Sequence, residues 1–424
     1  MKPLPWLSAC VIAGSLAGPV WAQPAPPPQG PQAALAPNAG LPAGSVTLRV
    51  ALDAAWQRAV ASRESEGQRR RADADRAAAD SFWAAPPSLE LSHRNDRLQS
   101  NGGKRETEVG VAVPLWLPGQ RAARAGTADA AVAQAVAAER VARLRLADEL
   151  REAAWQLAAL QAESAQADTL ARSLKQLGGD VERRVLAGDL ARADALAAQA
   201  EQLAASALQS DVRQRLQAAH ARWALLTGLT VVPDLSAGWV TNGVPATATV
   251  HPALQLASQS TELARKRVEL MRHSRRDAPE LTVGVRQDVP GRAEASQGSF
   301  NVGLRLPFGT DDRNRPLEAA ALAELDVAET HEQRLRERLD SDIAAARNAQ
   351  RAAEAQLEAE TARANLLRER AALIEKSFRA GETPLPDQLR ALAAAAQADS
   401  VVARQTVALG LARARLQQAL GLFP

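Results

Sequence analysis

The feature of this sequence that most limits its fold is an internal repeat with a constant spacing of 193 residues. Three short motifs occur twice at that spacing: Val113-Pro114-Leu115 and Leu306-Pro307-Phe308, Ala187-Gly188-Asp189 and Ala380-Gly381-Glu382, Thr227-Gly228-Leu229 and Leu420-Gly421-Leu422. Because the spacing does not drift, the chain contains two copies of one structural unit. We predict a first repeat at 46–229, a linker at 230–250 and a second repeat at 251–422.

Each repeat is predicted to contain a long helical hairpin. Apolar residues follow alternating steps of four and three from Leu339 to Phe378, broken at Gln350 and Glu360, and the first repeat has a matching pattern. This average spacing of about 3.5 residues is typical of left-handed coiled coils. Only 3% of the residues are aromatic, which favours closely packed helices over large globular cores. We place antiparallel coiled-coil hairpins at 120–228 and 315–421, with the first long helix ending near Gly178.

Two short segments with strict period-2 alternation precede each hairpin, and they are predicted to be strands. Their ranges are about 87–97 and 106–115 in the first repeat, and about 280–289 and 298–308 in the second. One face is apolar and the other polar, which fits a strand between lipid and water. It equally fits a soluble antiparallel sheet packed on a helix, so the strands alone leave both interpretations open.

In the membrane interpretation, each face of the strands has a predicted environment. The residues predicted to face lipid are Leu89, Leu91, Val109, Val111, Val113, Leu281, Val283, Val285, Val302, Leu304 and Leu306. Those predicted to face a water-filled lumen are Arg286, Asn301 and Arg305. Four strands cannot close a barrel, and open edges are not tolerated in hydrocarbon, so several copies must combine their strands. Three copies would supply twelve strands, enough to enclose water.

The N-terminus has the pattern of an export signal. Lys2 precedes the apolar stretch 7–20, and small residues end a predicted signal peptide at 1–22. Cys10 offers an alternative lipidation site, although few apolar residues precede it. Residues 23–45 are rich in Pro and Gly and are predicted to form an extended leader. No later segment contains the ~20 apolar residues that a transmembrane helix requires.

Several classes of function are disfavoured by what the sequence contains. The five histidines are scattered, and none lies at metal-ligand spacing from another candidate ligand. We find no phosphate-binding Gly-rich loop and no nucleophile elbow. The 51 basic and 48 acidic residues are interspersed, as on solvated helix faces, rather than gathered in a nucleic-acid-binding patch. We therefore predict no catalytic residues, cofactor, metal site or nucleic-acid partner.

The order of elements, strand pair then long hairpin, given twice after a signal peptide, resembles the TolC-like outer-membrane efflux proteins. The resemblance covers nearly all of the mature chain. Its most specific marks are the repeated strand ends and the turn stretches 185–189 and 378–382. The second half of the chain opens as it does in this family, with His251-Pro252-Ala253-Leu254. The first half departs from the family pattern, because it has Ser62-Arg63-Glu64 where an Asn-Pro or His-Pro pair is usual. Residues 114–121 resemble the heavy-metal-efflux branch.

The resemblance implies a mainly α fold with a β-barrel portion. It implies a homotrimer, with a twelve-stranded barrel in the Gram-negative outer membrane and an α-helical tunnel in the periplasm. Such a channel exports small toxic solutes passively, with heavy-metal cations as candidate cargo, while an inner-membrane pump of the resistance-nodulation-division type supplies energy through a periplasmic adaptor.

In that family an apolar-x-x-Gly turn lies at the periplasmic tip, where the adaptor docks. The residues that the resemblance places at this tip are Val185, Leu186, Ala187, Gly188, Phe378, Arg379, Ala380 and Gly381. Two alternatives remain. One is a type I secretion channel that exports proteins, and the other is a soluble periplasmic coiled-coil adaptor or scaffold.

Overall fold

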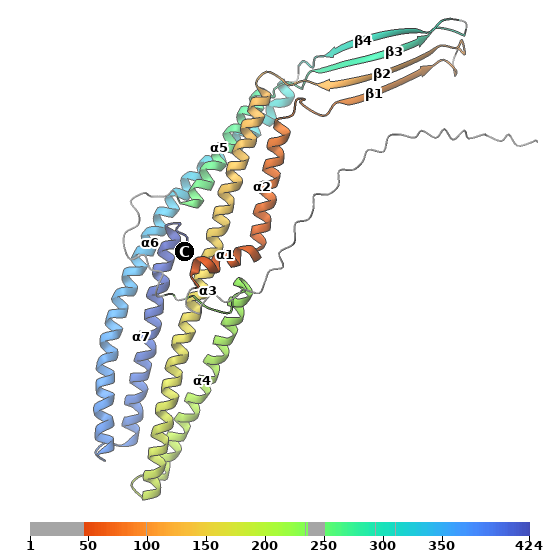
Figure 1. The fold of residues 1–424 in the computed structure, drawn as a ribbon. Coiled ribbons are helices and arrows are strands. Elements are labelled where there is room, and N and C mark those ends of the chain that lie inside the picture. Colours follow the sequence, from red (N-terminus) through yellow and green to blue (C-terminus); the bar gives the residue numbers. More distant parts are fainter. Residues whose placement is uncertain (1–45, 99, 234, 236–250, 293, 310) are drawn as a thin grey trace, which may run out of the picture. The chain divides into compact units, whose positions relative to one another are not determined.

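The computed structural model describes residues 46–424 except 99, 234, 236–250, 293 and 310. The predicted signal peptide, the leader at 23–45 and most of the linker at 230–250 lie outside the described residues. The chain divides into the units Met1–Ala43 and Gly44–Pro424, and every described element belongs to the second. In chain order (Figure 1) these are α1 (Leu48–Arg58), α2 (Val60–Ala79), β1 (Ser88–Asn95), β2 (Arg105–Pro114), α3 (Gln120–Ala187), α4 (Arg192–Thr227), α5 (Pro252–His273), β3 (Glu280–Val289), β4 (Gln297–Arg305), α6 (Asp311–Arg379) and α7 (Leu385–Ala419).

The second half repeats the element order of the first. The series α2-β1-β2-α3-α4 is followed by α5-β3-β4-α6-α7, and each element of the second series begins within two residues of the position 193 residues after its counterpart. The prediction of a mainly helical fold with four short strands is confirmed. Both helical hairpins are present as α3 with α4 and α6 with α7.

The prediction that the first long helix ends near Gly178 is wrong. Helix α3 continues through Gly178 and Gly179 to Ala187 and contains 68 residues, which is about 100 Å of helix. A Cβ atom on Gly178 would lie 3.1 Å from Oε1 of Gln202 on α4, so a larger residue would require only a small movement of this flexible side chain. The helix therefore continues through both glycines, and it ends instead at Gly188, whose φ angle is positive.

The sequence analysis did not predict the helices that precede the strand pairs, which are α1 and α2 in the first repeat and α5 in the second. Helix α2 buries Ser65, Ala72 and Ala79, which are spaced by seven residues, so its packing surface is a stripe of small side chains. Helix α1 has Thr47 as its N-cap, and the hydroxyl of Thr47 accepts a hydrogen bond from the Val50 amide at 3.3 Å. Because neither helix contains a long run of large apolar residues, the hydrophobic pattern gave little indication of them.

Helix α5 begins with His251 as its N-cap. Nδ1 of His251 accepts a hydrogen bond from the Ala253 amide at 3.1 Å, and Pro252 occupies the first helical position. A Cβ atom on Gly421 would lie 2.6 Å from the His251 ring, so the end of the second repeat packs on its own beginning. Burial lowers the pKa of His251, which keeps the imidazole neutral and its Nδ1 able to accept.

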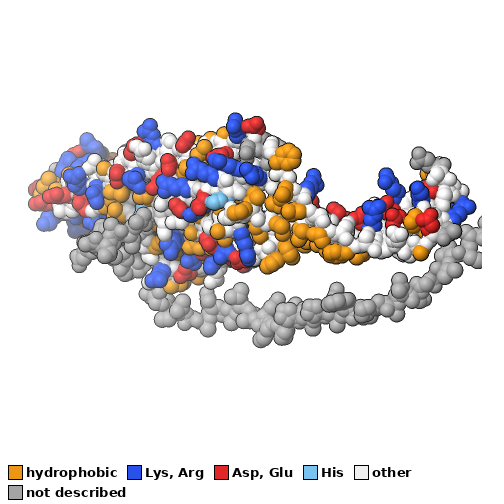
Figure 2. Space-filling view, turned by 90° about the horizontal axis from the view of Figure 1, so that it is seen from above, with side chains coloured by type: hydrophobic (Ala, Val, Ile, Leu, Met, Phe, Trp, Pro, Cys, Tyr) orange, Lys and Arg blue, Asp and Glu red, His pale blue; other side chains and the backbone are white. Residues whose placement is uncertain are grey.

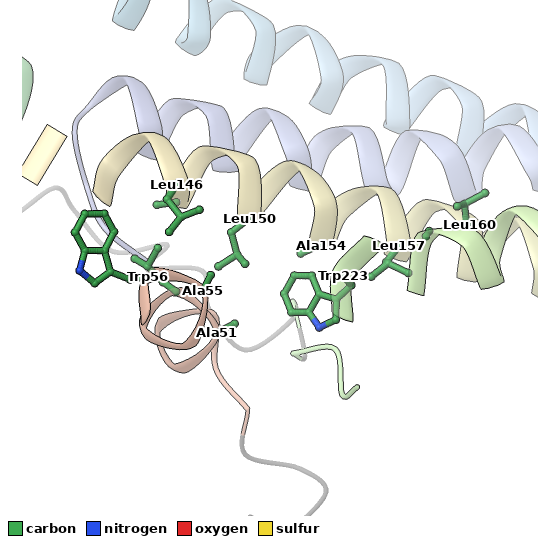
Figure 3. Close-up of a cluster of buried hydrophobic side chains, with 12 residues drawn as sticks. Ala51, Ala55, Trp56, Leu146, Leu150, Ala154, Leu157, Leu160 and Trp223 are labelled. Atoms are coloured by element: carbon green, nitrogen blue, oxygen red, sulfur yellow. The ribbon is translucent and has the colours of Figure 1, made fainter. Parts of the chain in front are cut away.

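The start of the first repeat is also attached to the end of its hairpin (Figure 3). Trp56 of α1 and Trp223 of α4 pack with leucines of α3 in one buried cluster, and Trp223 is fully buried. Nε1 of Trp223 donates to the carbonyl oxygen of Val231 at 3.1 Å, which satisfies its polar atom. The guanidinium of Arg143 lies 5.2 Å from the Trp56 ring centroid. This cluster fixes α1 against the hairpin of α3 and α4.

The two repeats are joined by contact between α3 and α7. Neighbouring helices follow the order α4, α3, α7, α6, so α4 and α6 are the outer members (Figure 1). Gly410 of α7 lies under the ring of Trp155 on α3, where an added Cβ atom would come within 2.1 Å of the indole. The repeats therefore pack as closely as they do only because residue 410 has no side chain.

A buried arginine also connects the repeats. Arg151 of α3 is 2% exposed and donates to the carbonyl oxygen of Leu422 at 2.7 Å and to the side chain of Gln418. Gln418 in turn donates to the carbonyl oxygen of Leu144 at 3.0 Å. Burial lowers the pKa of Arg151 to about 10. The arginine thereby satisfies carbonyl and amide oxygens where the second repeat ends against α3.

Candidate functional site

The four strands form one antiparallel sheet in the order β1-β2-β3-β4, with a continuous register. Leu89 pairs with Val111, Val111 with Val283, and Val283 with Val302, so one row of apolar residues crosses all four strands. Because side chains alternate along a strand, the other predicted lipid-facing residues of the strands lie on this same face. Leu306 directly follows β4. We call this surface the apolar face.

No described part of the chain covers the apolar face. Among the described residues, no helix packs against the sheet to more than a marginal extent. Leu89 is 74% exposed, Val302 is 61% exposed and Phe300, which shares this face, is 67% exposed. Apolar side chains gathered at this density on one side of a sheet are unusual on a protein surface that meets only water. The soluble interpretation of the strands requires a helix that covers these residues, and the described part of the subunit contains none.

The opposite face is polar, and four of its eight ionisable residues form ion pairs with each other. Nη2 of Arg286 lies 2.9 Å from Oε1 of Glu106, and Asn301 donates to Glu108. Arg305 lies 3.8 Å from Glu280. The three residues predicted to line a lumen thus share one face, opposite to the apolar one. Its ionisable residues, by register, are Glu90, Glu106, Glu108, Glu280 and Asp288 against Arg94, Arg286 and Arg305.

Both outer strands have an unpaired edge. Within the described residues β1 pairs only with β2, and β4 pairs only with β3. The N–H and C=O groups on the outer sides of β1 and β4 therefore find no strand partner in the part of the chain that the structure describes. Such edges are available for pairing with a strand of another molecule.

The loops at the end of the sheet away from the helices contact each other. Asp96 accepts hydrogen bonds from the hydroxyl of Ser100 at 2.8 Å and from the amide of Gly102 at 2.6 Å. The Ser100 bond is the main reason why the pKa of Asp96 is lowered. The amide of Arg292 donates to the carbonyl oxygen of Gly102 at 3.2 Å, so the β3–β4 loop is tied to the β1–β2 loop.

The opposite ends of the hairpins carry two turns of identical geometry. Gly188 and Gly381 have φ angles of 84° and 81°, a region that strongly favours glycine. In the first turn the Asp189 amide donates to the carbonyl oxygen of Arg184 at 2.8 Å. In the second turn the Glu382 amide donates to the carbonyl oxygen of Ser377 at 3.0 Å. Both are Schellman motifs, which end a helix and satisfy its last carbonyl oxygens.

Most of the predicted tip residues are at the surface, but Phe378 is not. Phe378 is 4% exposed and packs with Val181 and Leu385 in a cluster between the two hairpins. Arg184 lies 4.9 Å from its ring centroid and donates to its carbonyl oxygen at 3.1 Å. The phenyl ring therefore joins the hairpins and is not part of the exposed surface, because it completes an apolar cluster that spans both repeats. The exposed members of the predicted set are Leu186, Ala187, Gly188, Arg379, Ala380 and Gly381, and Val185 is half-buried.

A group of aromatic residues that the sequence analysis did not single out lies where the sheet meets the helices. Phe82 and Trp83 form an edge-to-face pair with centroids 4.5 Å apart. Nε1 of Trp116 donates to the carbonyl oxygens of Ser81 and Phe82 at 3.2 and 3.1 Å. Phe308, just after β4, is 92% exposed. The scarcity of aromatic residues elsewhere was the sequence signal that could have drawn attention to them.

Two further surveys cover the described part of the chain. No group of three or more His, Cys, Asp or Glu side chains there has the arrangement needed to hold a metal ion. No helix in that part combines the length and the apolar character that crossing a bilayer demands.

This arrangement of a four-stranded antiparallel sheet and two tandem helical hairpins is the fold of bacterial outer-membrane channel proteins. The outer membrane protein VceC of Vibrio cholerae is similar over 89% of this chain and 96% of its own, with a TM-score of 0.70 and 16% identity. A membrane protein of Pseudomonas aeruginosa is similar over 92% and 97%, with a TM-score of 0.71 and 19% identity. The CmeC outer membrane channel of Campylobacter jejuni is similar over 88% and 85%, with a TM-score of 0.67 and 14% identity. No protein-family model and no curated protein sequence matches the chain.

Proposed function

We propose that this chain is one subunit of a trimeric outer-membrane channel that serves a tripartite efflux system. The observation that carries the proposal is the uncovered apolar face of the sheet together with the unpaired edges of β1 and β4. Lipid would cover the face, and neighbouring copies would cover the edges. The shared fold with outer-membrane channels supports the same conclusion. In this role the protein is a passive conduit and not an enzyme.

Three copies would form a closed ring by pairing β4 of each copy with β1 of the next. This head-to-tail contact would give twelve strands, with the apolar face outward and the polar face lining a water-filled lumen. No strand edge would then remain exposed to hydrocarbon.

The helices offer a second surface for the same contact. Helix α4 exposes Leu196 and Leu203, which are 60% and 64% exposed, and helix α6 exposes Leu366 and Leu373, at 69% and 59%. Each pair is spaced by seven residues, the spacing of a coiled-coil seam. Since α4 and α6 are the outer helices, packing of α6 on α4 of the next copy would extend the ring into a helical tunnel through the periplasm.

We further propose that the exported solutes include cations, with heavy-metal ions as candidates. Five carboxylates against three arginines leave the polar face with an excess of two negative charges in each copy. Three copies would give an excess of six, and a lumen of this sign raises the local concentration of cations. Selective passage of potassium over chloride in a salt gradient would test this part of the proposal.

The energy and the connection to the inner membrane would come from partners. We propose that a periplasmic adaptor docks on the two helical turns, at the exposed residues Leu186 to Gly188 and Arg379 to Gly381. An inner-membrane pump of the resistance-nodulation-division type would supply the energy. Matching geometry at Gly188 and Gly381 would give six similar docking positions in a trimer.

The test combines conductance with the mass of the assembly. The processed chain, purified in detergent, is expected to have the mass of three copies and to produce stepwise conductance in planar lipid bilayers. Fractionation of cells provides the control, since the protein should leave the envelope only with detergent. A soluble, non-conducting monomer recovered from the periplasm without detergent would refute the channel and favour the adaptor alternative.

A further inference from the structure

We propose that the end of the sheet away from the helices binds the phosphate groups of lipopolysaccharide through Arg97, Lys104, Arg105 and Arg292. We call these four residues the basic rim. The inference rests on the proposed channel, because helices in the periplasm would place the rim beside the outer leaflet, which this phosphorylated glycolipid forms. Figure 2 shows Lys and Arg side chains gathered at that end of the sheet, with acidic side chains between them.

The side chains of the rim have no carboxylate partner in the described part of the chain. All four are exposed, and none forms an ion pair or a side-chain hydrogen bond with a described residue. Elsewhere in the same sheet Arg286 and Arg305 do pair, with Glu106 and Glu280. The donors of the rim are therefore available to an anionic ligand.

The net charge of the rim has the opposite sign to that of the polar face. The loops 96–104 and 290–296 contain the carboxylates Asp96 and Glu294, so four cations against two carboxylates leave an excess of two positive charges in each copy. Three copies would give an excess of six. Because the polar face has a negative excess, the sheet separates its charges, and the outer end attracts anions.

The rim begins where the apolar face ends. Beyond Val109 the next residues on that face are His93, Thr107 and Gln287, and the row after them contains Arg105. Because side chains alternate along a strand, Arg105 shares the face of the residues that would touch lipid. The acyl chains of a glycolipid beside the apolar face would therefore have their phosphate groups near this arginine. Basic residues at such a depth are attracted to anionic lipid headgroups.

The contact between the two loops holds Arg292 in the rim. Its amide donates to the carbonyl oxygen of Gly102 at 3.2 Å. Gly103 has a φ angle of 83°, and a Cβ atom there would overlap the side chain of Arg292. Arg292 of the second repeat thus packs on the residue that precedes Lys104 of the first. Since the rim is assembled in the free chain, binding costs less ordering, and the planar guanidinium suits phosphate oxygens.

The experiment measures binding of fluorescent deep-rough lipopolysaccharide to the full processed chain in non-ionic detergent. EDTA is present, so that divalent cations cannot bridge the ligand to carboxylates. Unlabelled dephosphorylated lipopolysaccharide and phosphatidylglycerol serve as competitors. We expect both to compete roughly tenfold or more weakly than the intact glycolipid, because the first has lost its phosphate groups and the second carries a single phosphodiester charge.

One triple variant removes most of the rim without touching a strand. Arg97→Gln, Lys104→Gln and Arg292→Gln together should weaken binding about 100-fold, at about fivefold for each basic residue beside an anionic lipid. The variant should still form conducting trimers, because these side chains make no ion pair in the described structure.

A matched variant controls for the loss of net charge. Arg49→Gln, Arg69→Gln and Lys175→Gln remove the same residue types from α1, α2 and α3, where the side chains are also exposed and without ion pairs among described residues. Their removal should leave the affinity for lipopolysaccharide unchanged.

The possible outcomes separate the rim from the channel. Conducting trimers that bind the dephosphorylated glycolipid as tightly as the intact one would overturn the rim and leave the channel in place. Equal weakening by the rim variant and the control variant would do the same. Phosphatidylglycerol that competes as well as lipopolysaccharide would show a general anionic-lipid surface and overturn the assignment. A soluble, non-conducting monomer would overturn the channel and the rim together.

Discussion

The substitution Val283→Arg tests whether the apolar face meets lipid. Val283 lies on the central strand β3, in the middle of the apolar row that runs from Leu89 to Val302. In a membrane barrel an arginine at the bilayer midplane costs about 2–4 kcal/mol. A trimer carries the substitution three times, so its assembly should lose roughly 6–12 kcal/mol. On a sheet that meets only water, where Val283 is already 37% exposed, a surface change costs about 0.5 kcal/mol or less.

Two matched variants make this prediction sharper. Gln287→Arg places the same side chain on the same face and strand, but roughly 10 Å closer to the membrane edge, where its cost should be about 0–1 kcal/mol. Thr282→Arg places it on the polar face beside Val283. The assay is urea unfolding of the protein in lipid vesicles, with trimer content followed by electrophoresis without heating. Equal stability of Val283→Arg, Gln287→Arg and Thr282→Arg would refute a lipid-facing sheet.

Three further predictions concern the helices. Gly410→Ala should cost about 1–3 kcal/mol of unfolding free energy, because its methyl group would overlap the Trp155 ring, and an unchanged denaturation midpoint would contradict this packing. Gly381→Trp should leave the trimer intact but abolish efflux-dependent resistance, because the indole would block the docking of the adaptor. Gly381→Ala has the same backbone strain and should retain resistance. Resistance in the Gly381→Trp strain would refute docking at this turn. Burial lowers the pKa of His251, so its stabilising N-cap bond to Ala253 is present above the ordinary histidine pKa and is lost as the pH falls through the lowered value. The unaltered chain should therefore lose about 0.5–2 kcal/mol more than His251→Asn between pH 7.5 and pH 4.5 in calorimetry, and identical pH profiles would argue against this role.

The strands and hairpins could be predicted because their signals are local and occur twice. Period-2 alternation places Val283 and its neighbours on one face, and the observed strand bounds lie within three residues of the predicted ones. The sheet order could not be read from the sequence, because pairing of β2 with β3 joins segments from different repeats. The repeat pattern describes each half separately and carries no information on how the halves pack.

The same limitation explains the residues that were misjudged. Phe378 belongs both to the predicted apolar seam and to the turn stretch assigned to the tip, and the structure buries it against Val181 of the other repeat. Its counterpart Val185 is only half-buried, so the equivalence of the repeats was a poor guide at this position. Helix α2 packs through Ser65, Ala72 and Ala79, and small side chains at this spacing resemble solvated positions until a partner helix is known. Arg151 appeared to be one of many interspersed charges, although it joins the two repeats.

The unpaired edges of β1 and β4 have a consequence for biogenesis. If β4 of one copy pairs with β1 of the next, an open row of copies always keeps one unpaired strand edge at each end. A dimer therefore exposes as many unpaired edges as a monomer, and only closure of the ring removes them. In the proposed channel, newly exported subunits would therefore be most vulnerable to irreversible aggregation before they insert into the membrane. Overproduction should raise that loss steeply with concentration, and periplasmic chaperones that shield β edges should limit it.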